Sequence, residues 1–248
     1  MTTPVAGVGG RLAAIACAIF EPELRAWSQA IPQLGRIELV RQDLHNTPRD
    51  LQAELVRVLA RVEDDAQVGA VALVYGLCSR AVDGLAPRRV PVAIPRVHDC
   101  ITLYLGSHAR YDEQMRRHPG TYWYTPGWSE VHRTPTGESR DRILAELIEK
   151  YGEDNGPYIF ETLHQSWMDN YSRAAYTDLG IGDVAQAEGV ARRLADERGW
   201  SYEKLPGDPG LLLRLLRGDW DGDDIVVVRP GQRLRMTGDQ RILEAVAT

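Results

Sequence analysis

All three cysteines of the chain follow short apolar runs that have the length of buried strands. Cys17 closes the first run, Cys78 comes three residues after the second, and Cys100 comes six residues after the third, with His98 just before it. In an open α/β sheet, ligands bind at the edge where the carboxyl ends of parallel strands meet, so we expect these side chains to lie close together. Thiolates are the ligands preferred by zinc, by iron–sulfur clusters and by Cu(I). The sequence therefore predicts a metal site.

The predicted ligands are Cys17, Cys78 and Cys100, with His98 as a fourth ligand or as a proton donor beside the metal. Asp99 is predicted to orient His98. Three separate strand ends, with no closely spaced cysteine pair, favour a [4Fe–4S] cluster whose open iron activates a small substrate as a Lewis acid. A zinc–thiolate enzyme for thiol or methyl transfer is the alternative. Two further interpretations stay open, a nucleophilic cysteine with His98 as its base and thiols that only pack in the core.

An aromatic segment, HPGTYWYTPGW at residues 118–128, is predicted to be a loop that covers this site. Its two prolines and two glycines argue against one regular element, and its four aromatic rings could exclude water. Within it, Tyr122, Trp123 and Trp128 are predicted to bind the cofactor or substrate. Arg96, which follows the third strand run, is predicted to bind an anionic group.

Strand and helix patterns alternate along the chain, which predicts an α/β fold: Rossmann-like, with a mostly parallel sheet and helices on both faces. The expected strands are 11–17, 37–40, 68–75, 90–94, 175–179, 200–205 and 225–228. The expected helices are 20–30, 47–62, 99–115, 140–151, 159–171, 184–198 and 210–217. Residues 1–10 are predicted to be disordered, and 11–248 to form one domain, with two lobes, 11–135 and 140–248, as the alternative.

Composition excludes several classes of protein. The net charge of −6 and the lack of a basic stripe argue against nucleic acid as a partner. No apolar run reaches the roughly 18 residues that a membrane span needs. The first residues do not resemble a signal peptide, so a cytoplasmic location, in which the cysteines stay as thiols, is expected. A small molecule is the expected substrate.

Several long stretches resemble the DUF1638 family: VYGLCS, VPVAIPRVHDCITLYLGS, HPGTYWYTPGW and LPGD…LLLRLLRGDWDGDDIVVVRPGQ. The resemblance runs from about Arg11 to Gln232, and many members have glycine where this chain has Ala18, next to the first cysteine. Members occur in microbes, often near corrinoid-dependent methyltransferase systems. The resemblance thus implies one-carbon metabolism, with corrinoid or methyltransferase proteins as partners. It also keeps open a non-enzymatic role as a metal- or corrinoid-binding accessory protein.

Overall fold

The computed structural model describes residues 10–129, 137–162 and 168–248, and the chain divides into two compact units. The first unit combines Met1–Tyr111 with Pro206–Thr248, and the second is Asp112–Leu205. This division differs from the predicted lobes 11–135 and 140–248, because the end of the chain returns to the first unit and adds a strand to its sheet. Of the residues predicted to be disordered, 1–9 lie outside the described part of the chain.

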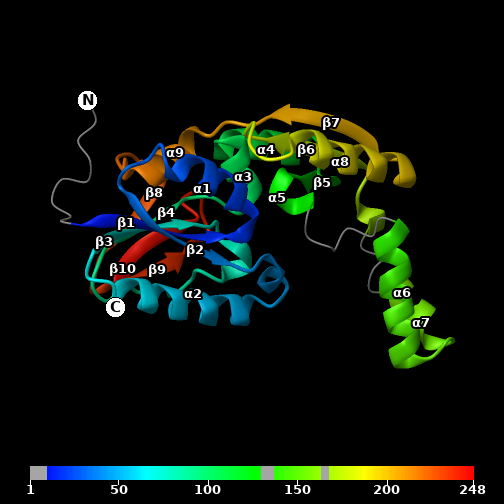
Figure 1. The fold of residues 1–248 in the computed structure, drawn as a ribbon, viewed down its shortest axis with the longest axis horizontal. Helices are drawn as coiled ribbons and strands as arrows, with labels where there is room; N and C mark the ends of the chain where they lie inside the picture. The colour runs from blue at the N-terminus through cyan, green and yellow to red at the C-terminus, as the bar shows by residue number, and fades with distance from the viewer. Residues whose placement is uncertain (1–9, 130–136, 163–167) are drawn as a thin grey trace. The chain divides into compact units, whose positions relative to one another are not determined.

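The first unit is built on a five-stranded sheet in the order β2-β1-β3-β4-β8 (Figure 1). These strands are β1 (Arg11–Cys17), β2 (Leu34–Val40), β3 (Val68–Val74), β4 (Val92–Pro95) and β8 (Ile225–Val228). The first four run parallel and β8 is antiparallel to β4. All seven residues of β3 are buried, as expected for a strand that is covered on both faces. The predicted α/β class and mostly parallel sheet are confirmed, whereas the Rossmann-like assignment stays a prediction.

Helices cover both faces of this sheet: α2 lies on one face, and α1 and α9 lie on the other (Figure 1). The helices of the first unit are α1 (Glu21–Ser28), α2 (Pro48–Glu63), α3 (Cys100–Leu105) and α9 (Gly210–Arg217). Three short 3₁₀ helices follow strand ends: η1 (Ala18–Phe20), η2 (Gln42–Asn46) and η3 (Cys78–Arg80). The helix predicted for 99–115 is instead two helices, because α3 ends at Gly106, which has φ 79°, and α4 (His108–Arg117) begins afterwards.

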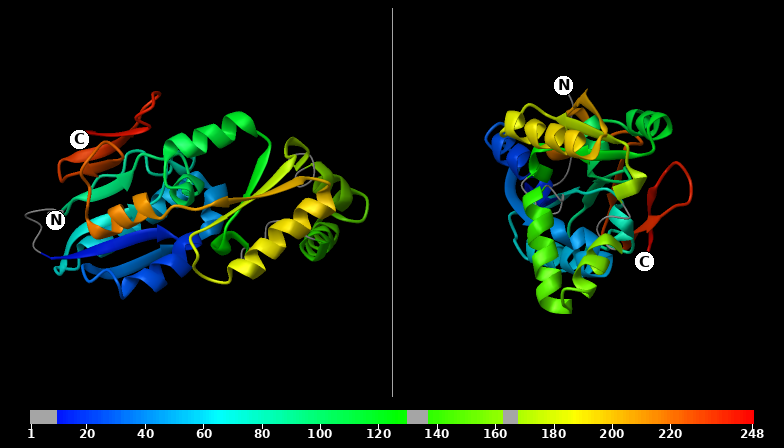
Figure 2. Two further views of the ribbon diagram at one scale, coloured as in Figure 1. Left: turned by 90° about the horizontal axis from the view of Figure 1, so that it is seen from above. Right: turned by 90° about the vertical axis from the view of Figure 1, so that its right-hand side faces the viewer.

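An antiparallel hairpin of β9 (Gln232–Met236) and β10 (Leu243–Ala247) completes the first unit (Figure 2). The sequence pattern predicted no strand after 225–228. Only Leu234 is fully buried in β9, where it alternates with arginines, so the apolar signal of this strand is weak.

The second unit has a three-stranded sheet in the order β5-β6-β7, formed by β5 (Thr121–Tyr124), β6 (Arg173–Asp178) and β7 (Ser201–Pro206). Its helices are α5 (Pro126–Ser129), α6 (Gly137–Tyr151), α7 (Asn155–Phe160), η5 (Met168–Asn170) and α8 (Val184–Arg198). The aromatic segment predicted as a loop is thus partly a strand, whose alternate residues Tyr122 and Tyr124 join a core built with α8. The helix predicted for 159–171 overlaps α7 only at its start, and residues 163–167 lie outside the described part of the chain. Among the described helices, none combines the length and apolar character that crossing a membrane requires.

Candidate metal centre

Four possible metal donors lie at the carboxyl ends of neighbouring strands in the first unit. Cys17 is the last residue of β1, His45 lies in η2 after β2, Cys78 begins η3 after β3, and Cys100 begins α3 after β4. In the order β2-β1-β3-β4, the chain leaves β1 toward β2 on one side and later builds β3 and β4 on the other. Loops diverge at such a reversal of strand order, and ligands of α/β proteins bind there.

The donor atoms of Cys17, His45 and Cys100 all lie within 4.8 Å of one another. The thiol of Cys78 joins them, since it forms hydrogen bonds with both Cys100 and His45. The three cysteines are buried and His45 is half-buried. The structure therefore confirms a group of cysteine and histidine side chains that could bind a metal ion.

One hydrogen bond orients the imidazole of His45 toward the thiols. Its Nδ1 lies 2.9 Å from the carbonyl oxygen of Gln42, so in the neutral ring Nδ1–H donates and Nε2 is left as the ligand atom. Histidine ligands of metals usually donate their second ring N–H in this way. The ring also stacks on Tyr75, with 6.2 Å between ring centroids.

The histidine among the thiols is therefore His45, whereas the sequence pointed to His98. Leu77 N–H donates to the carbonyl of Val97 at 2.9 Å, and Cys78 N–H donates to that of His98 at 3.1 Å. The backbone of His98 is thus turned toward the Cys78 loop, while its side chain is exposed and lies 5.2 Å from the ring of His108. His45 follows the strand run 37–40 by five residues. The strand-end argument applied to the cysteines could have found it.

Gly76 lets the loops after β3 and β4 approach closely. A Cβ atom at Gly76 would lie 2.6 Å from the backbone nitrogen of Asp99, so no side chain fits there. Two residues later, Cys78 has φ 42°, a left-handed conformation that costs energy in a residue other than glycine. This strained turn brings the Cys78 thiol to Cys100.

Asp99 holds the first turn of α3, which carries Cys100. Its Oδ1 accepts a hydrogen bond from the backbone N–H of Thr102 at 3.1 Å, which is an N-cap interaction. Its Oδ2 accepts one from the Tyr111 hydroxyl at 2.7 Å. The predicted role of Asp99 in orienting His98 stays a prediction, and these contacts tie Asp99 to the position of Cys100.

Electrostatic interactions shift the pKa values of the donor side chains in different directions. The hydrogen bond with Cys100, assisted by His45, lowers the pKa of Cys78 to about 6 against the effect of burial. Burial disfavours the imidazolium of His45, but its hydrogen bond with Cys78 and the charges of Cys78 and Cys17 raise the pKa of His45 to about 9. Hydrogen bonds with Cys17 and Cys78, together with burial, raise the pKa of Cys100. At neutral pH without a metal, the site thus holds a Cys78 thiolate, a His45 imidazolium and a Cys100 thiol.

The predicted cofactor-binding aromatic residues lie in the second unit. Tyr122 is 8% exposed, and its ring meets those of Tyr124 and Trp200 in tilted and that of Tyr171 in edge-to-face geometry, so it belongs to the core of that unit. Trp123 lies under the guanidinium of Arg173, and Trp128 packs against the same core. Their predicted role toward the metal site stays a prediction.

Arg96 lies in the first unit, where its guanidinium donates to the backbone carbonyls of Arg241 and Leu243, beside and at the start of β10. Burial lowers the pKa of Arg96. Its contacts hold the end of the chain, and its predicted binding of an anionic group stays a prediction.

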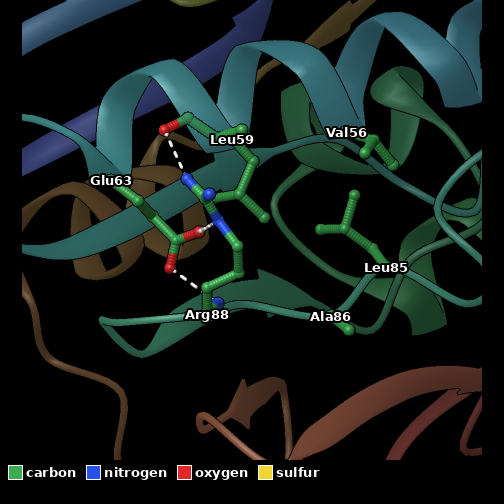
Figure 3. A pocket seen from close by; sticks show the side chains of 7 residues that line it. Val56, Leu59, Glu63, Leu85, Ala86 and Arg88 are labelled. Atoms are coloured by element: carbon green, nitrogen blue, oxygen red, sulfur yellow. Dashed lines mark hydrogen bonds and ion pairs between the residues drawn. The ribbon is translucent and has the colours of Figure 1, made fainter.

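A pocket in the first unit lies apart from the four donors, between α2 and the segment that precedes β4 (Figure 3). It is lined by Val56, Leu59, Ala60, Glu63, Leu85, Ala86 and Arg88. Glu63, at the end of α2, accepts hydrogen bonds from the backbone N–H groups of Arg88, Arg89 and Val90. This carboxylate holds the backbone that leads into β4. The three hydrogen bonds account for its burial without a bound ligand.

Comparison with known proteins gives one family match. A family model described as "Protein of unknown function (DUF1638)" matches residues 39–216. The match includes His45, Cys78 and Cys100 and begins after Cys17. No curated protein and no solved structure matches the chain.

Proposed function

The chain belongs to the DUF1638 family, and we propose that it binds one thiophilic metal ion, zinc, through Cys17, His45, Cys78 and Cys100. The observation that carries the proposal is the convergence of three buried thiols on an imidazole whose Nδ1–H is held by a backbone carbonyl. Zinc sites of the Cys₃His type use this donor set in tetrahedral geometry.

The close spacing of the donors favours a single ion over a cluster. A tetrahedral zinc ion with Zn–S bonds of about 2.3 Å holds its sulfur ligands roughly 3.8 Å apart. The donor atoms of Cys17, His45 and Cys100, which lie within 4.8 Å of one another, need only a small contraction to reach that geometry. A [4Fe–4S] cluster bonds each cysteine to a different iron and so spreads the sulfur atoms more widely. The cluster is therefore the alternative, and zinc is the preferred occupant.

Bound to such a site, a zinc ion would keep its thiol ligands deprotonated at neutral pH and so able to act as nucleophiles. Thiol or methyl transfer to or from a small molecule uses this chemistry, and it agrees with the corrinoid methyltransferase partners that the family resemblance implies. An accessory protein that binds the metal without turnover is the rival function. The two differ in whether the metal-loaded protein consumes a methyl donor.

Metal analysis of protein purified without oxygen tests the metal centre directly. We expect one zinc ion per chain and, by X-ray absorption, three sulfur ligands and one nitrogen ligand. A brown protein with iron and acid-labile sulfide would identify a cluster instead. A folded, metal-free protein in which the Cys→Ser variants change neither stability nor metal uptake would remove the proposal.

A thiol nucleophile is the second candidate, favoured by the pairing of Cys78 with His45. The pKa of Cys78 near 6 and that of His45 near 9 describe a thiolate–imidazolium pair, the activated form of a catalytic cysteine. This candidate predicts that zinc inhibits the protein and that the metal-free form is acylated or alkylated at Cys78 alone.

A further inference from the structure

The three thiols of the proposed metal site differ in the hydrogen bonds that they accept from other parts of the protein. Cys17 accepts one from the backbone N–H of Ile19 and one from the hydroxyl group of Tyr75. Tyr75 directly follows β3 and is fully buried, so this hydroxyl is held beside the sulfur. Cys78 accepts a hydrogen bond from one backbone N–H group in its own loop. Two of the three sulfur atoms therefore have donors that are not thiols.

Cys100 accepts no hydrogen bond of this kind from the described residues. Its hydrogen bonds are with the thiols of Cys17 and Cys78. Two donors in the same helical turn are used elsewhere, since the backbone N–H and the hydroxyl of Thr102 both donate to Oδ1 of Asp99. The Cys100 side chain is 7% exposed, compared with 6% for Cys78 and 1% for Cys17. Its sulfur is thus the least protected of the three.

Metal binding widens this difference. Thiols bind zinc as thiolates, so the protons that form the hydrogen bonds between the cysteines are lost. Cys17 then keeps two donors and Cys78 keeps one, whereas Cys100 keeps none from the described residues. A hydrogen bond to a charged sulfur stabilises the thiolate, and this stabilisation weakens when the sulfur gives up its lone pair to an electrophile. Cys100 should therefore be the most nucleophilic ligand.

We propose that Cys100 is the nucleophile of the metal-loaded site, and that its thiolate accepts an alkyl group from a soft alkyl donor. This inference rests on the proposed metal site and names the sulfur atom that reacts there. A lone pair of Sγ forms a bond to the alkyl carbon while the bond from that carbon to its leaving group breaks. The leaving group departs with its electron pair, no proton moves, and the product is a thioether at Cys100. Because three thiolates around a divalent cation leave one negative charge, the transfer also neutralises a buried charge.

Iodomethane tests this assignment on the zinc-loaded protein, and iodide is then the leaving group. The protein is treated with a limiting amount of reagent, digested, and analysed by mass spectrometry for one added methyl group at each cysteine. We expect Cys100 to be methylated at least about tenfold faster than Cys17 or Cys78. The metal-free protein is measured in parallel, because a cysteine nucleophile that acts without metal predicts alkylation at Cys78 instead.

Tyr75→Phe tests the physical reason for the assignment. The variant removes the hydroxyl that donates to Cys17 and keeps the ring that stacks on His45. Methylation of Cys17 in the zinc-loaded variant should become about tenfold faster, while that of Cys100 stays within about twofold. Tyr158→Phe, at a residue that is 68% exposed, is the matched control and should change neither rate. Zinc content and circular dichroism show whether each variant is loaded and folded, and if Tyr75→Phe does not fold, the wild-type rates decide the proposal.

The outcomes separate this inference from the metal centre. If the zinc-loaded wild type is methylated first at Cys17 or Cys78, or at no cysteine, the assignment to Cys100 is wrong and the metal centre stands. An unchanged rate at Cys17 in a folded, loaded Tyr75→Phe variant would overturn the argument from hydrogen bonds and the proposal with it. If the wild-type protein takes up no zinc, the metal centre and this inference both fail.

Discussion

Replacing His45 by alanine tests the feature that distinguishes the observed site from the predicted one. A ring nitrogen of His45 is one of three donor atoms that lie within 4.8 Å of one another, so the change removes a ligand from the centre of the site. It also removes the cation that helps to keep the pKa of Cys78 near 6. The Cys78 pKa then rises, and a metal ion must displace a proton from this thiol to bind it.

The loss in zinc affinity should be at least 100-fold at pH 7, which corresponds to about 2.7 kcal/mol. Removal of a group that only supports a ligand costs 10- to 100-fold, and His45 is a ligand itself. Competition with a chromophoric zinc chelator measures the affinity of the folded protein, and urea unfolding of the metal-free form measures its stability separately.

His98→Ala is the matched control for this measurement. The His98 side chain is exposed and lies beside His108, outside the described group of donors, so the variant should keep its zinc affinity within about twofold. If His98→Ala loses the metal and His45→Ala keeps it, the assignment of the fourth donor is reversed. Equal, unchanged affinities in both variants would show that the thiols bind the ion without any imidazole.

Three further predictions concern pH and stability. The ultraviolet thiolate absorbance of the metal-free protein should show a step near pH 6, the pKa of Cys78, and the step should move upward in His45→Ala. Because Cys78 takes up a proton below that pH, zinc affinity should fall by about tenfold per further pH unit from this thiol alone; a flat profile between pH 6 and 5 would contradict the assignment. Glu63→Ala leaves three backbone N–H groups without their acceptor and should lower the free energy of unfolding by about 3 kcal/mol. Glu63→Gln should retain most of the wild-type stability. Equal denaturation curves for the wild type and Glu63→Ala would refute this role. Asp99→Ala removes the N-cap of α3 and should lower the stability by about 1 kcal/mol. Because Cys100 begins that helix, the zinc affinity should also fall about tenfold. An unchanged zinc affinity would show that the N-cap does not help to position the metal ligand.

Much of the fold could be predicted from local patterns in the sequence. Three elements have the predicted bounds: the strand Arg11–Cys17 and the helices Val184–Arg198 and Gly210–Arg217. Each has a regular pattern of apolar residues between residues that clearly mark its start and its end. Errors occur where local signals are weak or ambiguous. Gly106 divides one predicted helix into two, and β9 alternates leucine with arginine in a hairpin that buries little apolar surface.

The sequence by itself determined that the cysteines would meet at one edge of the sheet. Each cysteine follows a strand, and parallel strands bring their carboxyl ends together whatever the details of packing. Which imidazole joins them was decided only by the tertiary structure. The pairing of the loops at Cys78 and His98 turns the His98 backbone inward, and the bond from His45 to the Gln42 carbonyl turns that ring toward the thiols. Side-chain direction in irregular loops depends on contacts between segments that are distant in the chain, and spacing along the sequence does not encode those contacts.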